Sequence, residues 1–277
     1  MSREEKFHSK KVSLKANYHT HTYFCDGLNT PEEMAEAAVR MGMEHLGFSG
    51  HVDVSPEMDV PAYLAEVRRI QEKYRDRIEI LCGGELDNLY PDRSLAGFDY
   101  LIGSVHHFRA GDEVLAIDWT EEILLHLLRD YYGGDGYRLC KTYFRTVAET
   151  YGKGKCDFIG HYDLITRFSG ALHYVDENDR RYLEPAYETM EYLVREGLPL
   201  EINTKLADRG KIYPGKALLK KLRELDGEIL LSSDAHRAED LMHGFEQGLE
   251  AARICGFDHV LILRREGKRI RFADVPI

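Results

Sequence analysis

The chain has 277 residues, of which 43% are apolar, enough to bury the core of one large α/β domain. Its formal net charge of −11 argues against nucleic acids and anionic membranes as partners, because proteins bind both through Lys and Arg. The five cysteines form no C-x-x-C pair, the N-terminus lacks the apolar stretch of a signal peptide, and no segment approaches the ~18 apolar residues of a membrane span. We therefore expect a cytoplasmic protein with reduced thiols.

Short apolar runs alternate with amphipathic stretches along the chain. The predicted strands are 12–19, 45–49, 78–83, 100–105, 157–160, 200–203 and 228–232. The predicted helices are 30–42, 61–77, 120–130, 137–151, 179–196, 214–226 and 239–255. The first helix has the clearest start, because Thr30 is a suitable N-cap, Pro31 suits the first turn and Glu33 completes a capping box.

The repeated strand-then-helix order predicts parallel strands joined by crossover helices and closed, or nearly closed, into a barrel. Nothing in the composition divides the chain, so residues 1–277 are expected to form a single domain. Residues 130–135 and the tail 260–270 are expected to be irregular or to be added at an edge.

Histidines and carboxylates recur at the C-terminal ends of the predicted strands. His19 and His21 are two residues apart, so a strand points both side chains to one face, and Asp26 follows in the next loop. Later strands end in His51, Glu85, His106, His161 and the pair Asp234 and His236. In a (β/α) barrel these strand ends converge on one mouth, where active sites are built.

Each of these residues alone would be read as an ordinary surface or core side chain. Together they indicate metal binding, because a buried cluster of imidazoles and carboxylates is too costly to desolvate without cations. Imidazole and carboxylate ligands suit Zn, Mn or Fe without selecting among them. About nine ligands exceed what one ion uses, so two or three ions are expected, and Glu85 could bridge two of them. His107 is expected to point away from the mouth, and Cys25 is read as a packed apolar side chain.

In chain order, the site residues lie in the motifs HTH…D, GH, GE, SVH, GH and DAH. With the segments GSVHHF, GHYDLITRF, LEINT and ILLSSDAHRAEDL, this pattern resembles the polymerase and histidinol phosphatase (PHP) family, and more closely its histidinol-phosphatase branch, over about residues 16–257. The resemblance implies a distorted seven-stranded (β/α)7 TIM-like barrel with a trinuclear metal site. The family's nine ligands match His19, His21, Asp26, His51, Glu85, His106, His161, Asp234 and His236. After LEINT, histidinol phosphatases often continue with a small glycine-containing turn, whereas this chain reads KLADRGKIYP.

The resemblance also implies a phosphoric monoester hydrolase of histidine biosynthesis that converts L-histidinol phosphate to L-histidinol and phosphate. A metal-activated hydroxide would attack the ester, with Glu85 bridging the ions and Asp234 or His236 assisting the leaving group. Arg167 and Arg209 are the main candidates to bind phosphate.

Lys205 is a second-line candidate to bind phosphate, because it is a basic residue near the end of a predicted strand. The cationic groups of histidinol would suit an acidic pocket, with Glu201 or Asp163 as possible partners. Two other functions stay open: a phosphoesterase or exonuclease of the same family acting on nucleotides or other small phosphate esters, and a metal-binding regulatory module without turnover. The complete ligand set disfavours the second. The sequence predicts no oligomeric state.

Overall fold

The computed structural model describes residues 14–53, 58–90, 95–267 and 269–277. Within them, the predicted parallel strands lie side by side in chain order: β1 (Ala16–Asn17), β2 (His45–Val52), β3 (Glu79–Asp87), β4 (Tyr100–Ser104), β7 (Phe158–Ile159), β8 (Leu200–Asn203) and β9 (Ile229–Ser232). The first predicted strand, 12–19, begins outside the described residues, and its described part forms ladder pairs only at Ala16 and Asn17.

The sheet curls until its first and seventh strands meet. A parallel bridge joins Thr20, just after β1, to Ala235, just after β9. The backbone N–H of His21 donates to the carbonyl of Ala235 over 2.8 Å, and the Ala235 N–H donates to the carbonyl of His19 over 3.2 Å. The α/β fold with a distorted, TIM-like barrel is therefore confirmed, and its closure lies at the C-terminal ends of the strands.

A C-terminal hairpin extends the sheet beyond the seven predicted strands. β10 (His259–Glu266) pairs in parallel with β9 and antiparallel with β11 (Arg269–Pro276), which gives a sheet of nine strands among the described residues. The hydroxyl of Tyr18 donates to the carbonyl of Leu263 over 2.8 Å and so links the hairpin to the first strand segment. The prediction that the tail is added at an edge is confirmed, but the alternative of an irregular tail is wrong, because full cross-strand pairing orders it.

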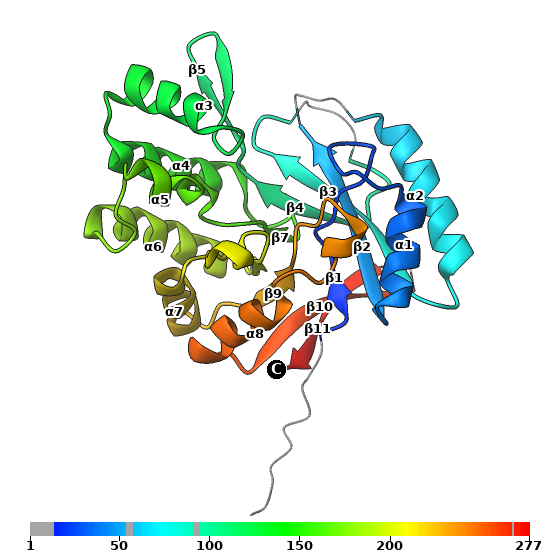
Figure 1. Cartoon of the computed structure of the whole chain (residues 1–277). Helices are drawn as coiled ribbons and strands as arrows, with labels where there is room; N and C mark the ends of the chain where they lie inside the picture. Colours follow the sequence, from blue (N-terminus) through cyan, green and yellow to red (C-terminus); the bar gives the residue numbers. More distant parts are fainter. Residues whose placement is uncertain (1–13, 54–57, 91–94, 268) are drawn as a thin grey trace, which may run out of the picture.

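The helices lie around the outside of the sheet (Figure 1). The longer ones are α1 (Pro31–Arg40), α2 (Val60–Tyr74), α4 (Gly136–Thr150), α6 (Arg180–Arg195), α7 (Lys216–Glu224) and α8 (Phe245–Ile254). The shorter ones are η2 (Leu164–Thr166), α5 (Ser169–Leu172), η3 (Ala207–Arg209) and η4 (Ala238–Asp240). The predicted capping box of α1 is present, since Thr30 Oγ1 accepts from the Glu33 N–H and the Glu33 carboxylate accepts from the Thr30 N–H. No helix of the described chain combines the length and the apolar character needed to cross a bilayer.

An insertion between β4 and α4 was not predicted as strands. β5 (His107–Ala110) and β6 (Glu113–Ala116) form an antiparallel hairpin, which is followed by α3 (Glu121–His126) and a π-helical turn, η1 (Leu127–Tyr131). The hairpin stands at one end of the molecule beside α3 (green in Figure 1). Each of its strands has four residues, too few for an alternating apolar pattern to stand out.

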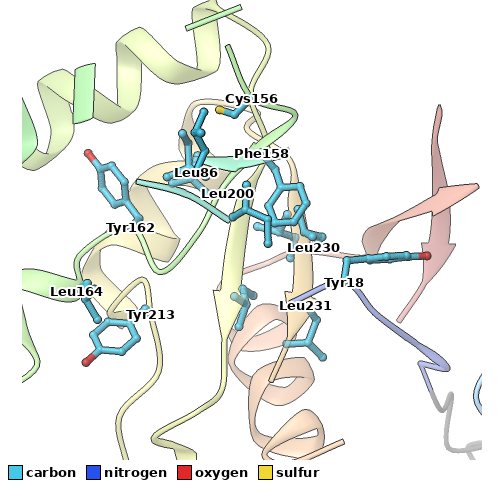
Figure 2. Packing of buried hydrophobic residues seen from close by; sticks show 14 of the residues in the cluster. Tyr18, Leu86, Cys156, Phe158, Tyr162, Leu164, Leu200, Tyr213, Leu230 and Leu231 are labelled. Atoms are coloured by element: carbon cyan, nitrogen blue, oxygen red, sulfur yellow. The ribbon is translucent and has the colours of Figure 1, made fainter. Parts of the chain in front are cut away.

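Aromatic side chains fill the interior of the barrel. The side chain of Tyr100 lies against Gly47 and Gly83, so closely that a Cβ added at either glycine would collide with it. Its hydroxyl donates to the carbonyl of Tyr18 over 2.5 Å. Phe158 stacks on Tyr100 with ring centroids 6.0 Å apart. Figure 2 shows Phe158 among Leu200 and Leu230 in this buried cluster. The packed apolar interior supports the C-terminal ends of the strands, where the polar residues lie.

Candidate metal centre

The nine predicted ligands come together at the C-terminal ends of the parallel strands. His19 and His21 follow β1, His51 and Glu85 lie near the ends of β2 and β3, and His106 follows β4. His161 follows β7, Asp234 and His236 follow β9, and Asp26 comes from the loop before α1. The strand ends therefore bring together residues that are up to 217 positions apart in the chain (236 − 19).

Glu85 lies at the middle of the cluster and is almost completely buried, at 1% exposure. Its Oε1 is 2.8 Å from Nε2 of His161 and 3.2 Å from Nε2 of His106. Its Oε2 is 3.1 Å from Nδ1 of His51 and 3.2 Å from Nε2 of His19. Oε2 also lies 3.5 Å from Nε2 of His21, so the two carboxylate oxygens face different sets of imidazoles, as expected of a carboxylate that bridges two metal ions.

Two further carboxylates complete the cluster on its outer side. Asp234 Oδ1 lies 3.2 Å from Nε2 of His21. Asp26 Oδ2 lies 2.9 Å from Nε2 of His236, and its Oδ1 lies 3.6 Å from Nε2 of His51. The side chain of Asp26 is 35% exposed, so the cluster opens toward solvent on this side.

Potential ligand atoms gather in four overlapping sets, each with all atoms within 4.8 Å of one another. The sets are His21, Asp26, His51 and His236; His19, His21 and Glu85; His19, His161 and Asp234; and His51, Glu85 and His106. Several of these atoms are buried without a hydrogen-bond partner, among them Nε2 of His19 and His21 and Oε2 of Glu85. Buried polar atoms are rarely left unpaired, so bound cations fit this arrangement.

The charges of the cluster shift the pKa values of its members in both directions. Burial would lower the pKa values of His19 and His106, but neighbouring carboxylates such as Glu85 outweigh it and raise both, so each holds a proton that a bound metal ion would displace. Burial alone would raise the pKa of Glu85, but the positive charges of His19 and His106 outweigh it and hold that pKa well below its usual range. Burial, together with the charges of His236 and His51, lowers the pKa of His21 to about 3. Glu85 is therefore a carboxylate and His21 a neutral imidazole near pH 7, the forms that bind divalent metals.

A second layer of carboxylates orients the imidazoles. Glu201 Oε1 lies 2.7 Å from Nδ1 of His19, and its Oε2 accepts a 2.8 Å hydrogen bond from the backbone N–H of His161. Asp87 Oδ2 accepts a 2.9 Å hydrogen bond from the backbone N–H of His106 and lies 3.4 Å from its Nδ1. Contacts of this kind fix which ring nitrogen of a histidine is presented to a metal.

Comparison with known proteins places the chain in a family. The model of the PHP domain matches residues 17–205. The chain belongs to the PHP-domain family. This chain is 25% identical over 269 residues to the histidinol-phosphatase of Bacillus subtilis, covering 85% of this chain and 98% of that protein. It is 29% identical over 244 residues to the histidinol-phosphatase of Lactococcus lactis, covering 81% of this chain and 85% of that protein.

The crystal structure of histidinol phosphate phosphatase from Lactococcus lactis, complexed with Zn, L-histidinol and phosphate, has the same fold. Its TM-score to this chain is 0.69 at 22% sequence identity, and the alignment covers 93% of this chain and 99% of that one. The family and the curled parallel sheet with outer helices, both expected from the sequence, are thereby confirmed.

A cavity at the metal centre of the PHP domain contains two of the three residues predicted to bind phosphate. Arg167 and Lys205 line it together with seven of the predicted ligands, and Lys205 Nζ lies 3.1 Å from Asp234 Oδ1. Arg209 lies instead in a neighbouring hollow that also contains Lys205, Asp234 and His236. Arg209 therefore does not line the cavity that contains Arg167 and Glu85.

The cavity also contains two polar residues that the sequence analysis did not single out, Asp118 and Tyr213, besides the apolar Leu164. Asp118 follows the unpredicted hairpin, and the buried Tyr213 hydroxyl has no hydrogen-bond partner within the described chain. Tyr213 belongs to the segment KLADRGKIYP, whose departure from the family's usual turn was the one available signal.

Glu201 and Asp163, the suggested partners of the cationic groups of a substrate, lie inside the fold. Both are buried, at 0% and 1% exposure, and neither lines the cavity at the metal centre. Glu201 bonds to His19, while Asp163 Oδ2 accepts hydrogen bonds from the Tyr182 hydroxyl and the Gly215 N–H. The structure therefore gives no support to a direct contact of either carboxylate with substrate, and that contact stays a prediction.

Cys25 and His107 stand beside the candidate ligand sets of the described residues without joining them. Burial, and next the charge of Asp26, raises the pKa of Cys25 to about 12, so without a bound metal ion it is a neutral thiol near pH 7. Nδ1 of His107 lies 3.3 Å from Asp87 Oδ1, in the second layer.

Proposed function

We propose that this PHP domain is a metal-dependent phosphomonoesterase that hydrolyses L-histidinol phosphate to L-histidinol and phosphate, a step of histidine biosynthesis. The observation that carries the proposal is the buried cluster in which both oxygens of Glu85 face imidazoles from different strands. The names of the curated relatives support the same substrate, and the Lactococcus lactis structure was solved with zinc, histidinol and phosphate.

The nine clustered residues are proposed to hold two or three divalent ions, of zinc, manganese or iron. Ions bound there supply a water of lowered pKa and neutralise the phosphoryl oxygens, which is the chemistry that a phosphate ester requires. Glu85 holds the two halves of the cluster together. Arg167 and Lys205 would bind the phosphoryl group, since both line the cavity and carry positive charge.

Asp234 and His236 were both candidates to assist the leaving group, and the ionisation of Asp234 bears on its role. Burial raises the pKa of Asp234, but Lys205 and His19 outweigh it and hold that pKa well below its usual range. Asp234 is then an anion near pH 7, suited to be a ligand or to accept a proton from the attacking water. His236, whose side chain is 22% exposed and lines the cavity, would either complete the ligand set or, where it is left uncoordinated, assist the leaving alkoxide.

The substrate is tested by comparing kcat/KM for a panel of phosphate esters on the metal-replete protein. L-histidinol phosphate is expected to exceed nucleoside monophosphates by at least about tenfold, or ~1.4 kcal/mol of transition-state binding. The acidic residues of the cavity, including Asp118, favour a substrate with cationic groups over a neutral nucleoside. A nucleotide or sugar phosphate that surpasses histidinol phosphate would overturn the substrate and leave the phosphatase in place.

Replacing Arg167 with alanine is expected to raise KM for L-histidinol phosphate by at least about tenfold, because a charge-assisted hydrogen bond to phosphate is lost. The fall in kcat should be smaller, since the metal ligands are unchanged. Steady-state kinetics separate the two effects. Arg253→Ala, an exposed arginine on α8 outside the cavity lining, is the matched control and should keep the wild-type KM. An unchanged KM in the Arg167→Ala protein would remove Arg167 from the substrate site.

A further inference from the structure

A second cavity, of about 520 Å³, lies between the β5–β6 insertion and helix α4, at the end of the molecule drawn in green in Figure 1. Its wall includes Phe108 and Arg109 of β5, Tyr131 of the π-helical turn η1, and Arg138, Lys141 and Arg145 of α4. It shares no residue with the cavity at the metal centre. Its volume falls within the roughly 300–1,000 Å³ typical of small-molecule sites.

Positive charge is concentrated in this cavity, although the chain as a whole carries a net charge of −11. Arg138, Lys141 and Arg145 are spaced three and four residues apart, so they share one face of α4. Arg145 has only a 3.7 Å contact with Glu149. Within the described chain, Arg109, Arg138 and Lys141 form no ion pair. Like charges at this spacing repel, and a bound anion would relieve that repulsion.

Aromatic rings stand beside these cations. Phe108 is buried, and the hydroxyl of Tyr131 donates to the Glu113 carboxylate over 2.6 Å, which fixes the position of that ring. The Arg138 guanidinium lies 5.5 Å from the centre of the Tyr132 ring. Tyr131 belongs to the π-helical turn η1, and such turns are rare and often occur at functional sites. The wall thus offers rings for stacking next to groups that bind phosphate.

We propose that this cavity is a ligand site for a nucleoside diphosphate, with the diphosphate on Arg109, Arg138 and Lys141 and the base against the exposed ring of Tyr131. Three unpaired cations match the charge of about −3 on a diphosphate group near neutral pH, since each phosphate monoester or terminal group has a second pKa near ~6. The rings distinguish this ligand from an inorganic anion. The site is separate from the metal centre, so its occupation does not depend on the identity of the phosphatase substrate.

The test is calorimetric titration of the metal-replete full-length protein with methylene-bridged ADP, whose diphosphate resists hydrolysis. The charge-reversal variant R138E/K141E is compared with K216E/K220E. Lys216 and Lys220 are exposed lysines of α7 that lie outside the cavity. We expect saturable binding to the wild type and to K216E/K220E, weakened at least about tenfold in R138E/K141E, because two charge-assisted contacts are reversed. R109E, on β5, should weaken binding in the same direction and covers the case in which the double variant fails to fold.

Three results would contradict parts of this proposal. Binding that survives both R138E/K141E and R109E would place the nucleotide elsewhere, including at the metal centre, and overturn the proposal. Methylenediphosphonate, which lacks the base, should bind at least about tenfold more weakly than the nucleotide, since ring stacking contributes ~1–3 kcal/mol. Equal affinity for the two would overturn the assignment of the aromatic wall, and binding of RNA without binding of the nucleotide would overturn the small-molecule site. Phosphate release by R138E/K141E should match that of K216E/K220E.

Discussion

Replacing Glu85 with glutamine is expected to lower kcat for phosphate release by at least about a hundredfold, because loss of even an outer-layer partner of a metal ligand typically costs 10–100-fold. Both oxygens of Glu85 face imidazoles, and the amide would turn one acceptor into a donor within the buried cluster. Steady-state kinetics and metal content, measured on the same preparation, check the expectation. Fewer bound metal ions should accompany the lower rate.

The control for Glu85→Gln is Glu250→Gln, the same change at an exposed position of α8. This variant should keep the wild-type rate and metal content. A Glu85→Gln protein with unaltered kcat and a full complement of metal would show that the carboxylate charge does not hold the cluster together.

Asp234→Asn should also lower kcat by at least about a hundredfold while leaving the fold intact. Asp234 adopts a left-handed backbone conformation with φ of 51°. Asparagine tolerates this region nearly as well as aspartate, so the substitution removes the charge without adding backbone strain. The lost carboxylate contacts both Lys205 Nζ and His21 Nε2. Kinetics combined with thermal unfolding separate the loss of chemistry from a loss of stability.

Asp226→Asn is a closely matched control for Asp234→Asn. Asp226 has a similar left-handed backbone, with φ of 53°, but its side chain is 92% exposed and pairs with Arg223 outside the cluster. The control should retain full activity. If Asp234→Asn hydrolysed the substrate as fast as the Asp226→Asn control, Asp234 would have no part in the reaction.

The strand ends could be predicted from the sequence because their signals are local. Period-two spacing put His19 beside His21 and Asp234 beside His236, and the apolar runs before Glu85 and His161 identified strands of a parallel sheet. The structure brings these residues together, as the common direction of parallel strands requires. Their role as metal ligands stays a prediction.

The residues that escaped the sequence analysis depend on long-range geometry. Asp118 reaches the cavity only because the short β5–β6 hairpin turns the chain back toward the metal centre. Tyr213 is brought there by a loop that pairs with Asn203, and neither position carries a periodic pattern. The contacts of Glu201 with His19 and with the His161 N–H were not predicted, since a residue within a predicted strand does not reveal which neighbour its side chain meets. Local periodicity predicts faces, whereas loops and side-chain partners require the three-dimensional structure.

The central claim is tested most directly by restoring divalent metal stepwise to chelated protein and measuring phosphate release from L-histidinol phosphate against the number of ions bound per chain. Zinc, manganese and iron are each titrated. We predict no release from the metal-free protein and a rate that rises until more than one ion is bound, because Glu85 and its neighbours form overlapping ligand sets. A rate that is complete with a single ion would contradict the multinuclear centre, and no release at full metal occupancy would contradict the phosphatase.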